Sequence, residues 1–318
     1  MAKKYAFLFP GQGAQAPGMA KDIAESSAAA KKVIDDISSI INMDMAQLLW
    51  ESDAASLSRS DNSQIAITAA SLAAVAALKE KGIEPHAAMG FSLGEFPALY
   101  AAGVLSFEDV IQVVRQRGLI MQSVCDEIAA KNEGHAPGMT AVIGLSPEKV
   151  REIASGITDA YAANMNSEKQ TVVSGTAEAL EAVEKAASQA GARRAIRLKV
   201  AGPFHSPLMQ KAADEFEQAI AGVQFSDPAI HLFSNVTGKE CVSGEEAKKS
   251  AVLHLTHPVL WTDEEKNLAA VMQADGFENW AALEAGPGKV LGGLWGNTEY
   301  ASSLTVAPAG TAQALSSL

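Results

Sequence analysis

Cysteines and basic residues are scarce in this 318-residue chain. Cys125 and Cys241 are the only cysteines, too few for a disulfide framework or a zinc site and typical of a reducing compartment. Lys and Arg number 25 against 37 Asp and Glu, so the formal net charge is −12. This balance argues against general nucleic-acid binding, which needs a basic surface, but leaves small anionic ligands open because local groups hold them.

Long hydrophobic runs are also missing. Pro10 and Gly11 interrupt the first apolar run too soon for a signal-peptide core, and the most apolar window, 65–78, is too short to span a bilayer. We therefore expect a soluble, cytoplasmic protein. Hydrophobic residues make up 48% of the chain and there is no low-complexity tract, so a substantial core and a second small domain are possible.

Short apolar runs alternate with helical patterns, which is typical of an α/β protein. Residues 5–9 predict a buried first strand, residues 20–41 predict helical structure, and residues 86–90 predict a strand that leads into a helix over 93–102. Helix N-caps are predicted at Asp61, Ser106, Thr176 and Thr262.

The middle of the chain has the element order β-α-β-β-α-β, which is the ferredoxin-like pattern. We predict a ferredoxin-like small subdomain at residues 128–200. It is inserted into a discontinuous large domain that comprises residues 1–127 and 201–318.

The segment Gly90-Phe91-Ser92-Leu93-Gly94 matches the G-x-S-x-G motif. A tight strand-to-helix turn presents the serine hydroxyl above the sheet, and the N–H of Leu93 at a helix N-terminus can stabilise an oxyanion. The alternative is a plain Gly/Ser turn, since the motif is short. The strand before it and the helix after it favour Ser92 as a nucleophile.

A serine nucleophile needs a base, and the chain has six histidines. His205 lies in a loop just before a helix, where its side chain can point into a cleft. The residues alone favour it only modestly over His254 and His257. No acidic residue stands beside it in the sequence to complete a triad.

Two further features have two interpretations each. The loop Gly11-Gln12-Gly13 lacks the third glycine of a dinucleotide fingerprint, and either turns an N–H toward an oxyanion or is an ordinary turn. Arg117, in an apolar helical setting, is either a snorkelling side chain or a buried fork for a substrate carboxylate.

Taken together, the motifs resemble the malonyl-CoA:acyl-carrier-protein transacylases, and are similar to polyketide synthase acyltransferase domains. Each matching segment is weak alone, but the set follows the family's order over nearly the whole chain: residues 9–15, 90–95, 115–118, 164–166, 204–209, 234–238 and 284–289.

The resemblance implies an α/β-hydrolase-like large domain with an inserted ferredoxin-like subdomain. It implies that Ser92 forms the acyl ester, that His205 is the general base and then the acid, and that Arg117 pairs with the malonyl carboxylate. The backbone N–H groups of Gln12 and Leu93 would form the oxyanion hole.

Other implied roles concern the surroundings of this site. Phe204 and Asn166 are assigned to substrate binding, and the aromatic Phe204 leaves little room for an α-methyl group. Phe91 stands where the family usually has histidine or another polar residue, so a contact near the pocket mouth would differ. His254 stands where the family has a glutamine that orients the catalytic histidine, so we expect its ring, or else Asn235 or a backbone carbonyl, to accept that hydrogen bond. With His254 as acceptor, activity would fall more steeply on acidification than with glutamine.

We therefore expect an S-malonyltransferase of fatty-acid synthesis that works by a ping-pong route through malonyl-Ser92. Malonyl-CoA is the substrate and acyl carrier protein the acceptor, without a bound cofactor or metal, nucleic acid or membrane, and with the enzyme as a monomer. The alternatives are a serine esterase or thioesterase, a polyketide-type acyltransferase, and a carrier-binding scaffold without activity.

An acidic carrier requires a local basic surface. We predict a carrier-binding or CoA-binding face on the last strand of the small subdomain and the preceding helix, with an ordinary solvated face as the alternative. Its residues are Lys185, Arg193, Arg197 and Lys199.

Overall fold

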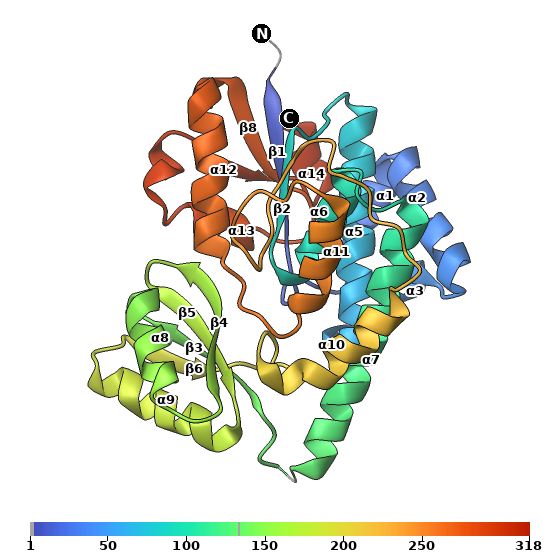
Figure 1. Cartoon of the computed structure of the whole chain (residues 1–318). Coiled ribbons are helices and arrows are strands. Elements are labelled where there is room, and N and C mark those ends of the chain that lie inside the picture. Colours follow the sequence, from blue (N-terminus) through green and yellow to red (C-terminus); the bar gives the residue numbers. More distant parts are fainter. Residues whose placement is uncertain (1–2, 133) are drawn as a thin grey trace.

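The computed structural model of the chain describes residues 3–132 and 134–318. Its larger part is built on five parallel strands in the order β7-β2-β1-β8-β9 (Figure 1). They span Lys4–Phe9 (β1), Ala87–Gly90 (β2), His231–Leu232 (β7), Trp280–Glu284 (β8) and Val306–Pro308 (β9). Residues 6–9 of β1 are apolar and fully buried, as a central parallel strand with both faces covered requires.

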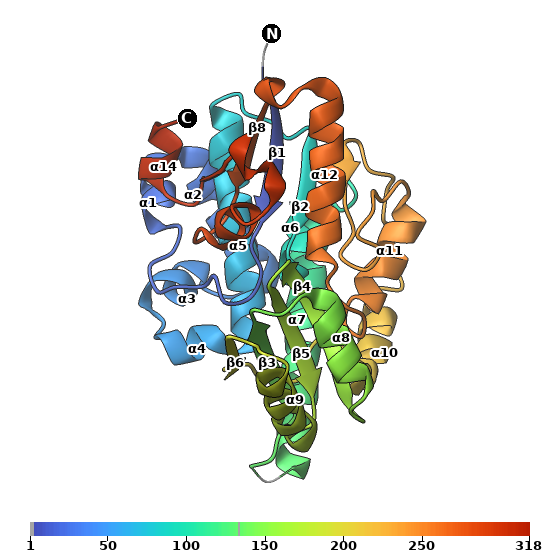
Figure 2. The ribbon, with the colours of Figure 1, turned by 90° about the vertical axis from the view of Figure 1, so that its left-hand side faces the viewer.

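Helices cover both faces of this sheet. Phe7 and Phe9 pack in a core with α5, α6 and α7, whereas Ala6 and Leu8 pack against α12 and α13 on the other face. Figure 1 shows these two helix layers on either side of the strands, and Figure 2 shows α12 beside the strands from another direction. The bounds are Ser60–Glu80 (α5), Glu95–Ala101 (α6), Phe107–Lys131 (α7), Trp261–Asp275 (α12) and Val290–Trp295 (α13).

The remaining helices of the large part contribute to the same core as α5. They are Lys21–Ser26 (α1), Ala28–Ile41 (α2), Met45–Glu51 (α3), Ala54–Ser58 (α4), Gln210–Ala219 (α10), Gly244–Leu253 (α11) and Ala312–Ser316 (α14). Within the described part of the chain, no helix combines the length and apolar character needed to cross a membrane.

The second sheet is antiparallel, in the order β4-β5-β3-β6. Its elements are Gly138–Ile143 (β3), Pro147–Ser155 (α8), Ala160–Ser167 (β4), Gln170–Gly175 (β5), Ala177–Gln189 (α9) and Arg194–Arg197 (β6). Helices α8 and α9 form a small core with one face of the sheet, around Val142, Val173 and Leu180. The predicted α/β fold with a ferredoxin-like subdomain is confirmed.

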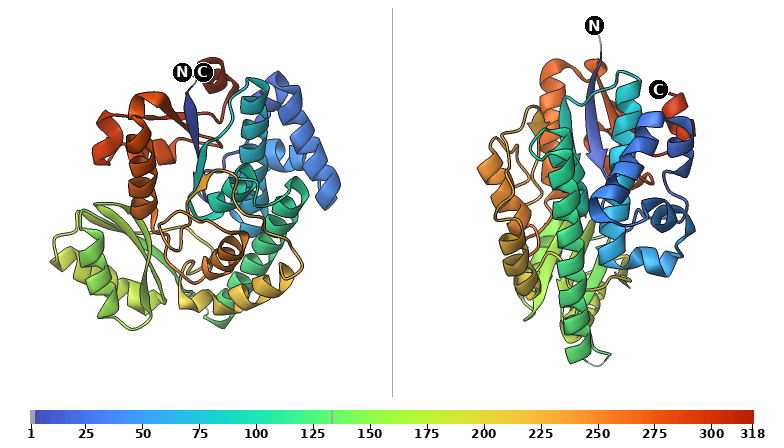
Figure 3. Two further views of the ribbon diagram at one scale, coloured as in Figure 1. Left: turned by 45° about the horizontal axis from the view of Figure 1, so that its top comes forward. Right: turned by 90° about the vertical axis from the view of Figure 1, so that its right-hand side faces the viewer.

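Contacts join the two parts closely. Met139, Ala141 and Val172, on the other face of the small sheet, belong to the core of the large part. Helix α7 continues to Lys131, past the predicted boundary at residue 127, and reaches the level of the small subdomain (Figure 3). The domain ranges stay a prediction, and residues 1, 2 and 133, which they include, lie outside the described residues.

Three details add to or differ from the sequence predictions. The helical structure predicted over 20–41 consists of two helices, because Ser27 is extended and its hydroxyl caps α2 at Ala30. Asp61 is no N-cap: α5 begins at Ser60, so Asp61 lies in the first turn and pairs with Arg59 at 3.0 Å. Likewise α12 begins at Trp261, two residues too early for Thr262 to cap it. The caps at Ser106 and Thr176 are confirmed.

Candidate active site

The turn between β2 and α6 forces Ser92 into a left-handed backbone conformation, with φ of 52°. Such a conformation costs about 1–2 kcal/mol for a residue with a side chain. Its glycine neighbours are needed for close packing: a Cβ at Gly90 would overlap the carbonyl group of Gly94, and a Cβ at Gly94 would overlap the carbonyl of Phe9. The strained serine thus lies at the carboxyl edge of the parallel sheet, where open α/β sheets bind ligands.

His205 meets Ser92 across this edge. The Oγ of Ser92 lies 2.9 Å from Nε2 of His205, and Nδ1 of His205 lies 2.8 Å from the backbone carbonyl oxygen of His254. A carbonyl can only accept, so Nδ1 carries the proton and Nε2 is left free to accept from the serine hydroxyl. The loop before α10 places His205 here with a positive φ of 58°.

The environment of His205 keeps it neutral. Burial lowers the pKa of His205 to about 4, and the positive charge of Arg117 acts in the same direction. Its ring is therefore uncharged at neutral pH and available as a base.

The orienting acceptor for His205 is a backbone carbonyl, the last of the three predicted alternatives, and not the ring of His254. The ring of His254 is fully buried, its centroid lies 4.9 Å from that of His205, and neither ring nitrogen has a hydrogen-bond partner among the described residues. Burial and the neighbouring charges hold the pKa of His254 well below its usual value. The main chain of residue 254 orients His205, which removes the basis for the steeper acid dependence expected of a histidine side chain here.

Asn235 does not orient His205 either. Its Oδ1 accepts a hydrogen bond from the backbone N–H of Ser92 at 2.7 Å, and its Nδ2 donates to the carbonyl of Gly90 at 2.6 Å. The amide of Ser92 is thereby occupied, so it is not free to serve as an oxyanion donor.

The loop after β1 packs directly against the nucleophile turn. A Cβ at Gly11 would overlap the carbonyl oxygen of Phe91, and the side chain of Gln12 is anchored by donation to Ser63 Oγ at 2.9 Å. Leu93 follows Ser92 in the turn Ser92–Gly94 (η1), which precedes α6. The predicted oxyanion residues, Gln12 and Leu93, are thus on neighbouring segments. Phe91 packs edge-on against Trp261, with ring centroids 5.3 Å apart.

Arg117 is fully buried on α7. One terminal nitrogen donates to Oε1 of Gln64 at 2.7 Å, the guanidinium lies 5.3 Å from the ring centre of Phe96, and Nε has no hydrogen-bond partner among the described residues. Burial lowers the pKa of Arg117 to about 10, against the opposing effect of Glu95, so it remains a cation at neutral pH. A buried cation with spare donors can hold a carboxylate.

Sequence reasoning missed two residues around Arg117. Gln64 lies in an Ala-rich helix without a motif, so nothing in the sequence marks it as a partner of a side chain 53 residues away. Glu95 follows the serine motif directly and is buried at the start of α6, and this burial raises the pKa of Glu95 to about 8.

The other predicted substrate residues are also buried. Phe204 precedes His205 in the same loop, and its carbonyl accepts a hydrogen bond from Ser174 Oγ of β5, which ties the loop to the small subdomain. Asn166 lies on β4, and its side-chain oxygen has no hydrogen-bond partner among the described residues.

The predicted basic face is exposed at the edge of the small sheet. Lys185, Arg193, Arg197 and Lys199 are all exposed, and Arg197 pairs with Glu184 at 2.9 Å. Ile196 and Val200, in the same stretch of chain, are about 40% exposed.

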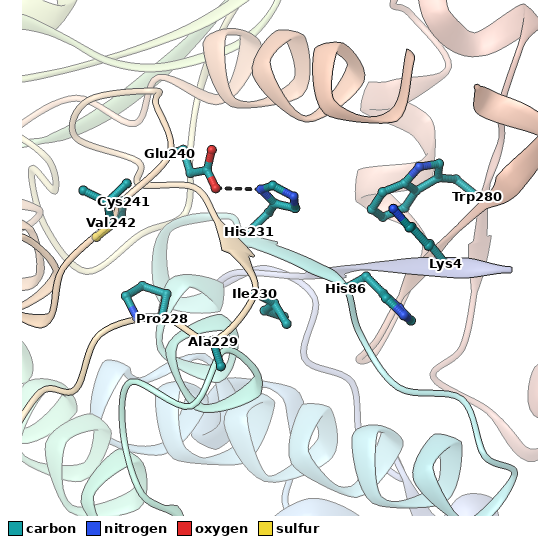
Figure 4. A pocket seen from close by; sticks show the side chains of 10 residues that line it. All are labelled: Lys4, His86, Pro228, Ala229, Ile230, His231, Glu240, Cys241, Val242 and Trp280. Carbon is teal, nitrogen blue, oxygen red and sulfur yellow. Dashed lines mark hydrogen bonds and ion pairs between the residues drawn. The ribbon is translucent and has the colours of Figure 1, made fainter. Parts of the chain in front are cut away.

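Two cavities differ in their relation to the chemistry. One, of about 490 Å³, borders His205 and lies between the segment 256–258 and α8 and β4 of the small subdomain. The other, of about 440 Å³, lies at the amino edge of the parallel sheet, lined by His86, His231 and Trp280 (Figure 4). Because β2 runs from residue 87 to 90 before Ser92, this second cavity is at the far edge from the Ser92–His205 pair. Among the described residues no cluster of His, Cys, Asp and Glu side chains is suited to a metal ion.

Comparison with known proteins gives a consistent result. The acyl transferase domain family matches residues 6–278. The malonyl CoA-acyl carrier protein transacylase of Bacillus subtilis is 36% identical over 295 residues, which cover 92% of this chain and 89% of that protein. An acyl carrier protein S-malonyltransferase from Vibrio cholerae superposes with a TM-score of 0.89, at 31% identity and 99% coverage of both chains. A malonyl-transacylase solved in complex with a type II polyketide synthase acyl-carrier protein gives 0.88, at 33% identity, covering 99% of this chain and 98% of that one.

Proposed function

The chain belongs to the acyl transferase domain family, and we propose that Ser92 and His205 are the nucleophile and base with which it transfers malonyl from malonyl-CoA to acyl carrier protein. The single observation that carries the assignment is the 2.9 Å contact between Ser92 Oγ and His205 Nε2 at the strained turn. The buried cation of Arg117 on the neighbouring helix supports malonyl as the acyl group.

Acylation begins with a proton transfer. As Ser92 Oγ attacks the thioester carbon of malonyl-CoA, its proton passes to Nε2 of His205, and the carbonyl of His254 stabilises the imidazolium that forms. The N–H groups of Gln12 and Leu93 receive the tetrahedral oxyanion. Collapse of the intermediate breaks the C–S bond, His205 protonates the CoA sulfur, and malonyl-Ser92 remains.

The second half-reaction runs the same steps in reverse order with another thiol. The phosphopantetheine thiol of the carrier gives its proton to His205, attacks the ester carbon, and leaves with the malonyl group, while Ser92 recovers its proton. We place the pantetheine arm in the cavity that borders His205, since that cavity opens between the two parts of the molecule. The exposed basic side chains Lys185, Arg193, Arg197 and Lys199 are our proposed contact for the acidic carrier or for CoA phosphates.

Selectivity for malonyl follows from Arg117 and Phe204. An acetyl group would leave the buried guanidinium without an anionic partner, and the buried ring of Phe204 beside His205 limits the room for an α-methyl branch. Asn166, whose side-chain oxygen has no hydrogen-bond partner in the described part of the chain, is proposed as a further substrate contact.

Fatty-acid synthesis is the proposed setting, with a monomer acting in the cytoplasm; the two cysteines, both free and buried, fit a reducing compartment. A polyketide carrier is the second candidate acceptor, because one similar structure holds such a carrier. An esterase or thioesterase would release malonate to water instead.

One assay separates transfer from hydrolysis. The enzyme is incubated with malonyl-CoA labelled in the malonyl group, with and without holo carrier protein, and the label is followed to carrier or free malonate. We expect carrier-bound label to form far faster than malonate. Rapid release of malonate in the presence of carrier would establish a hydrolase and refute the proposal.

A further inference from the structure

Asn235 makes a two-point contact with the nucleophile turn that the reaction steps above do not use. Its side-chain oxygen accepts from the N–H of Ser92 at 2.7 Å, and its side-chain nitrogen donates to the carbonyl of Gly90 at 2.6 Å. These two backbone groups flank Phe91, so one carboxamide bridges the two peptide units that join Gly90, Phe91 and Ser92.

A carboxamide in this orientation satisfies both groups. Turning the side chain over would set its nitrogen against the N–H of Ser92 and its oxygen against the carbonyl of Gly90, which gives two repulsive contacts in place of two hydrogen bonds. A carboxylate could keep the first bond but would set an oxygen against Gly90. The side chain is also fully buried, so water cannot replace either bond.

Asn235 is itself held from elsewhere in the fold. Its backbone carbonyl accepts from the N–H of Leu260 at 2.9 Å, and its Nδ2 also lies 3.3 Å from Oε2 of Glu264 on α12. The loop that carries it is closed by the bond from Gly238 N–H to the carbonyl of Ser234 at 2.8 Å. The contact with the turn is therefore made from a fixed point outside the turn.

From these contacts we infer that Asn235 is a positioning residue that holds Ser92 in the left-handed conformation in which its hydroxyl meets His205. The inference rests on the proposed function of Ser92 as nucleophile. Asn235 touches neither substrate nor His205 in this role. Its loss would displace Oγ from Nε2 of His205, and misplacement by about 1 Å lowers a reaction rate about 100-fold.

The test compares Asn235→Ala and Asn235→Asp with wild type in single-turnover acylation by malonyl-CoA. We expect the maximum acylation rate constant to fall about 100-fold in Asn235→Ala and at least about 10-fold in Asn235→Asp, with the half-saturating malonyl-CoA concentration unchanged. A damaged binding site would raise that concentration instead. Asn267→Ala is the matched control, since Asn267 also binds a carbonyl of this loop, that of Gly238 at 2.8 Å, but not the turn.

A second measurement makes the result independent of malonyl-CoA. A small fluorophosphonate reacts with an activated serine without needing Arg117, and we expect its labelling of Ser92 to slow by the same factor in both variants. If wild type is labelled but does not transfer malonyl, the proposed function fails while the positioning role is still judged.

The outcomes are decisive in each case. A folded Asn235→Ala protein that reacts within about threefold of wild type with both reagents overturns the inference. If the alanine variant does not unfold cooperatively, Asn235→Asp decides by the same criterion, because it keeps the size of the side chain. A loss confined to the half-saturating concentration also overturns the inference.

Discussion

Replacing Arg117 by alanine probes the selectivity of the site most sharply. The guanidinium is fully buried, still cationic at neutral pH, and held by Gln64 through a 2.7 Å hydrogen bond. In Arg117→Ala a malonyl carboxylate would enter the site without its counter-charge. Breaking one side of a buried ion pair costs about 3–5 kcal/mol, so kcat/KM for malonyl-CoA should fall roughly 150- to 5,000-fold.

The same change should act in the opposite direction on acetyl-CoA. Acetyl transfer by the wild type leaves the buried cation unpaired, and removing the cation removes that penalty. We expect acetyl transfer to carrier protein to be retained or to rise, so that the preference for malonyl over acetyl collapses or inverts. The assay is the transfer rate for both thioesters, measured side by side on each variant.

Arg115→Ala is the control for this experiment. Arg115 lies on the same helix and is half-buried, with its guanidinium bound to the carbonyl of Asp61 at 2.9 Å. Its replacement by alanine removes the same formal charge as Arg117→Ala. It should leave the malonyl preference unchanged. If Arg117→Ala folds and keeps malonyl transfer within about fivefold of wild type, the role assigned to Arg117 is wrong.

Three further predictions concern pH and the carrier. The acid limb of kcat/KM should follow the pKa of His205, about 4, since protonation below it removes the base; His254→Gln should leave that limb in place, because the main chain of residue 254 is the acceptor. Burial raises the pKa of Glu265 to about 8, above its unfolded value of 4.5, so its contribution to stability is present below pH 4.5 and lost as pH rises to 8. Glu265→Gln should therefore raise the unfolding free energy by about 2–4 kcal/mol at pH 8 and change it little at pH 4.5, as urea unfolding would measure. Reversing Arg193 and Arg197 to Glu should raise the KM for carrier several-fold; a rise in the KM for malonyl-CoA instead would assign this face to the CoA phosphates.

Each of these has a contrary result. If the acid limb of wild type lies at higher pH than that of His254→Gln, the acceptor for His205 is the ring of His254 and not its main chain. An equal stability gain at both pH values would show that Glu265 does not titrate in this window. An unchanged KM for both carrier and malonyl-CoA after the double reversal would make the basic face an ordinary solvated surface.

The sequence predicts best those features that depend on neighbouring residues. The turn around Ser92 is readable because the overlap that excludes a side chain at Gly90 arises within the motif itself. The caps at Ser106 and Thr176 are local for the same reason. Asp61 is not an N-cap, because its helix begins earlier, at Ser60. Packing against other helices can move the first residue of a helix in this way.

The features that the sequence hides are long-range or lie in the main chain. The orienting acceptor of His205 is a carbonyl group, which every residue carries, so the identity of residue 254 gave no information about it. Asn235 meets Ser92 across 143 residues, and Gln64 meets Arg117 across 53. Neither pair has a spacing that could reveal it, because the helices and strands between them decide the contact.

The central claim is that Ser92 carries the malonyl group between two thiols. Its most direct test is peptide mass spectrometry of the enzyme quenched in acid after mixing with malonyl-CoA, before and after addition of holo carrier. We expect a malonyl ester on Ser92 that disappears when carrier is added, with malonyl-carrier formed in equal amount, and no ester in Ser92→Ala. Malonyl transfer at the wild-type rate by Ser92→Ala, or an ester on another residue that carrier discharges, would contradict the account.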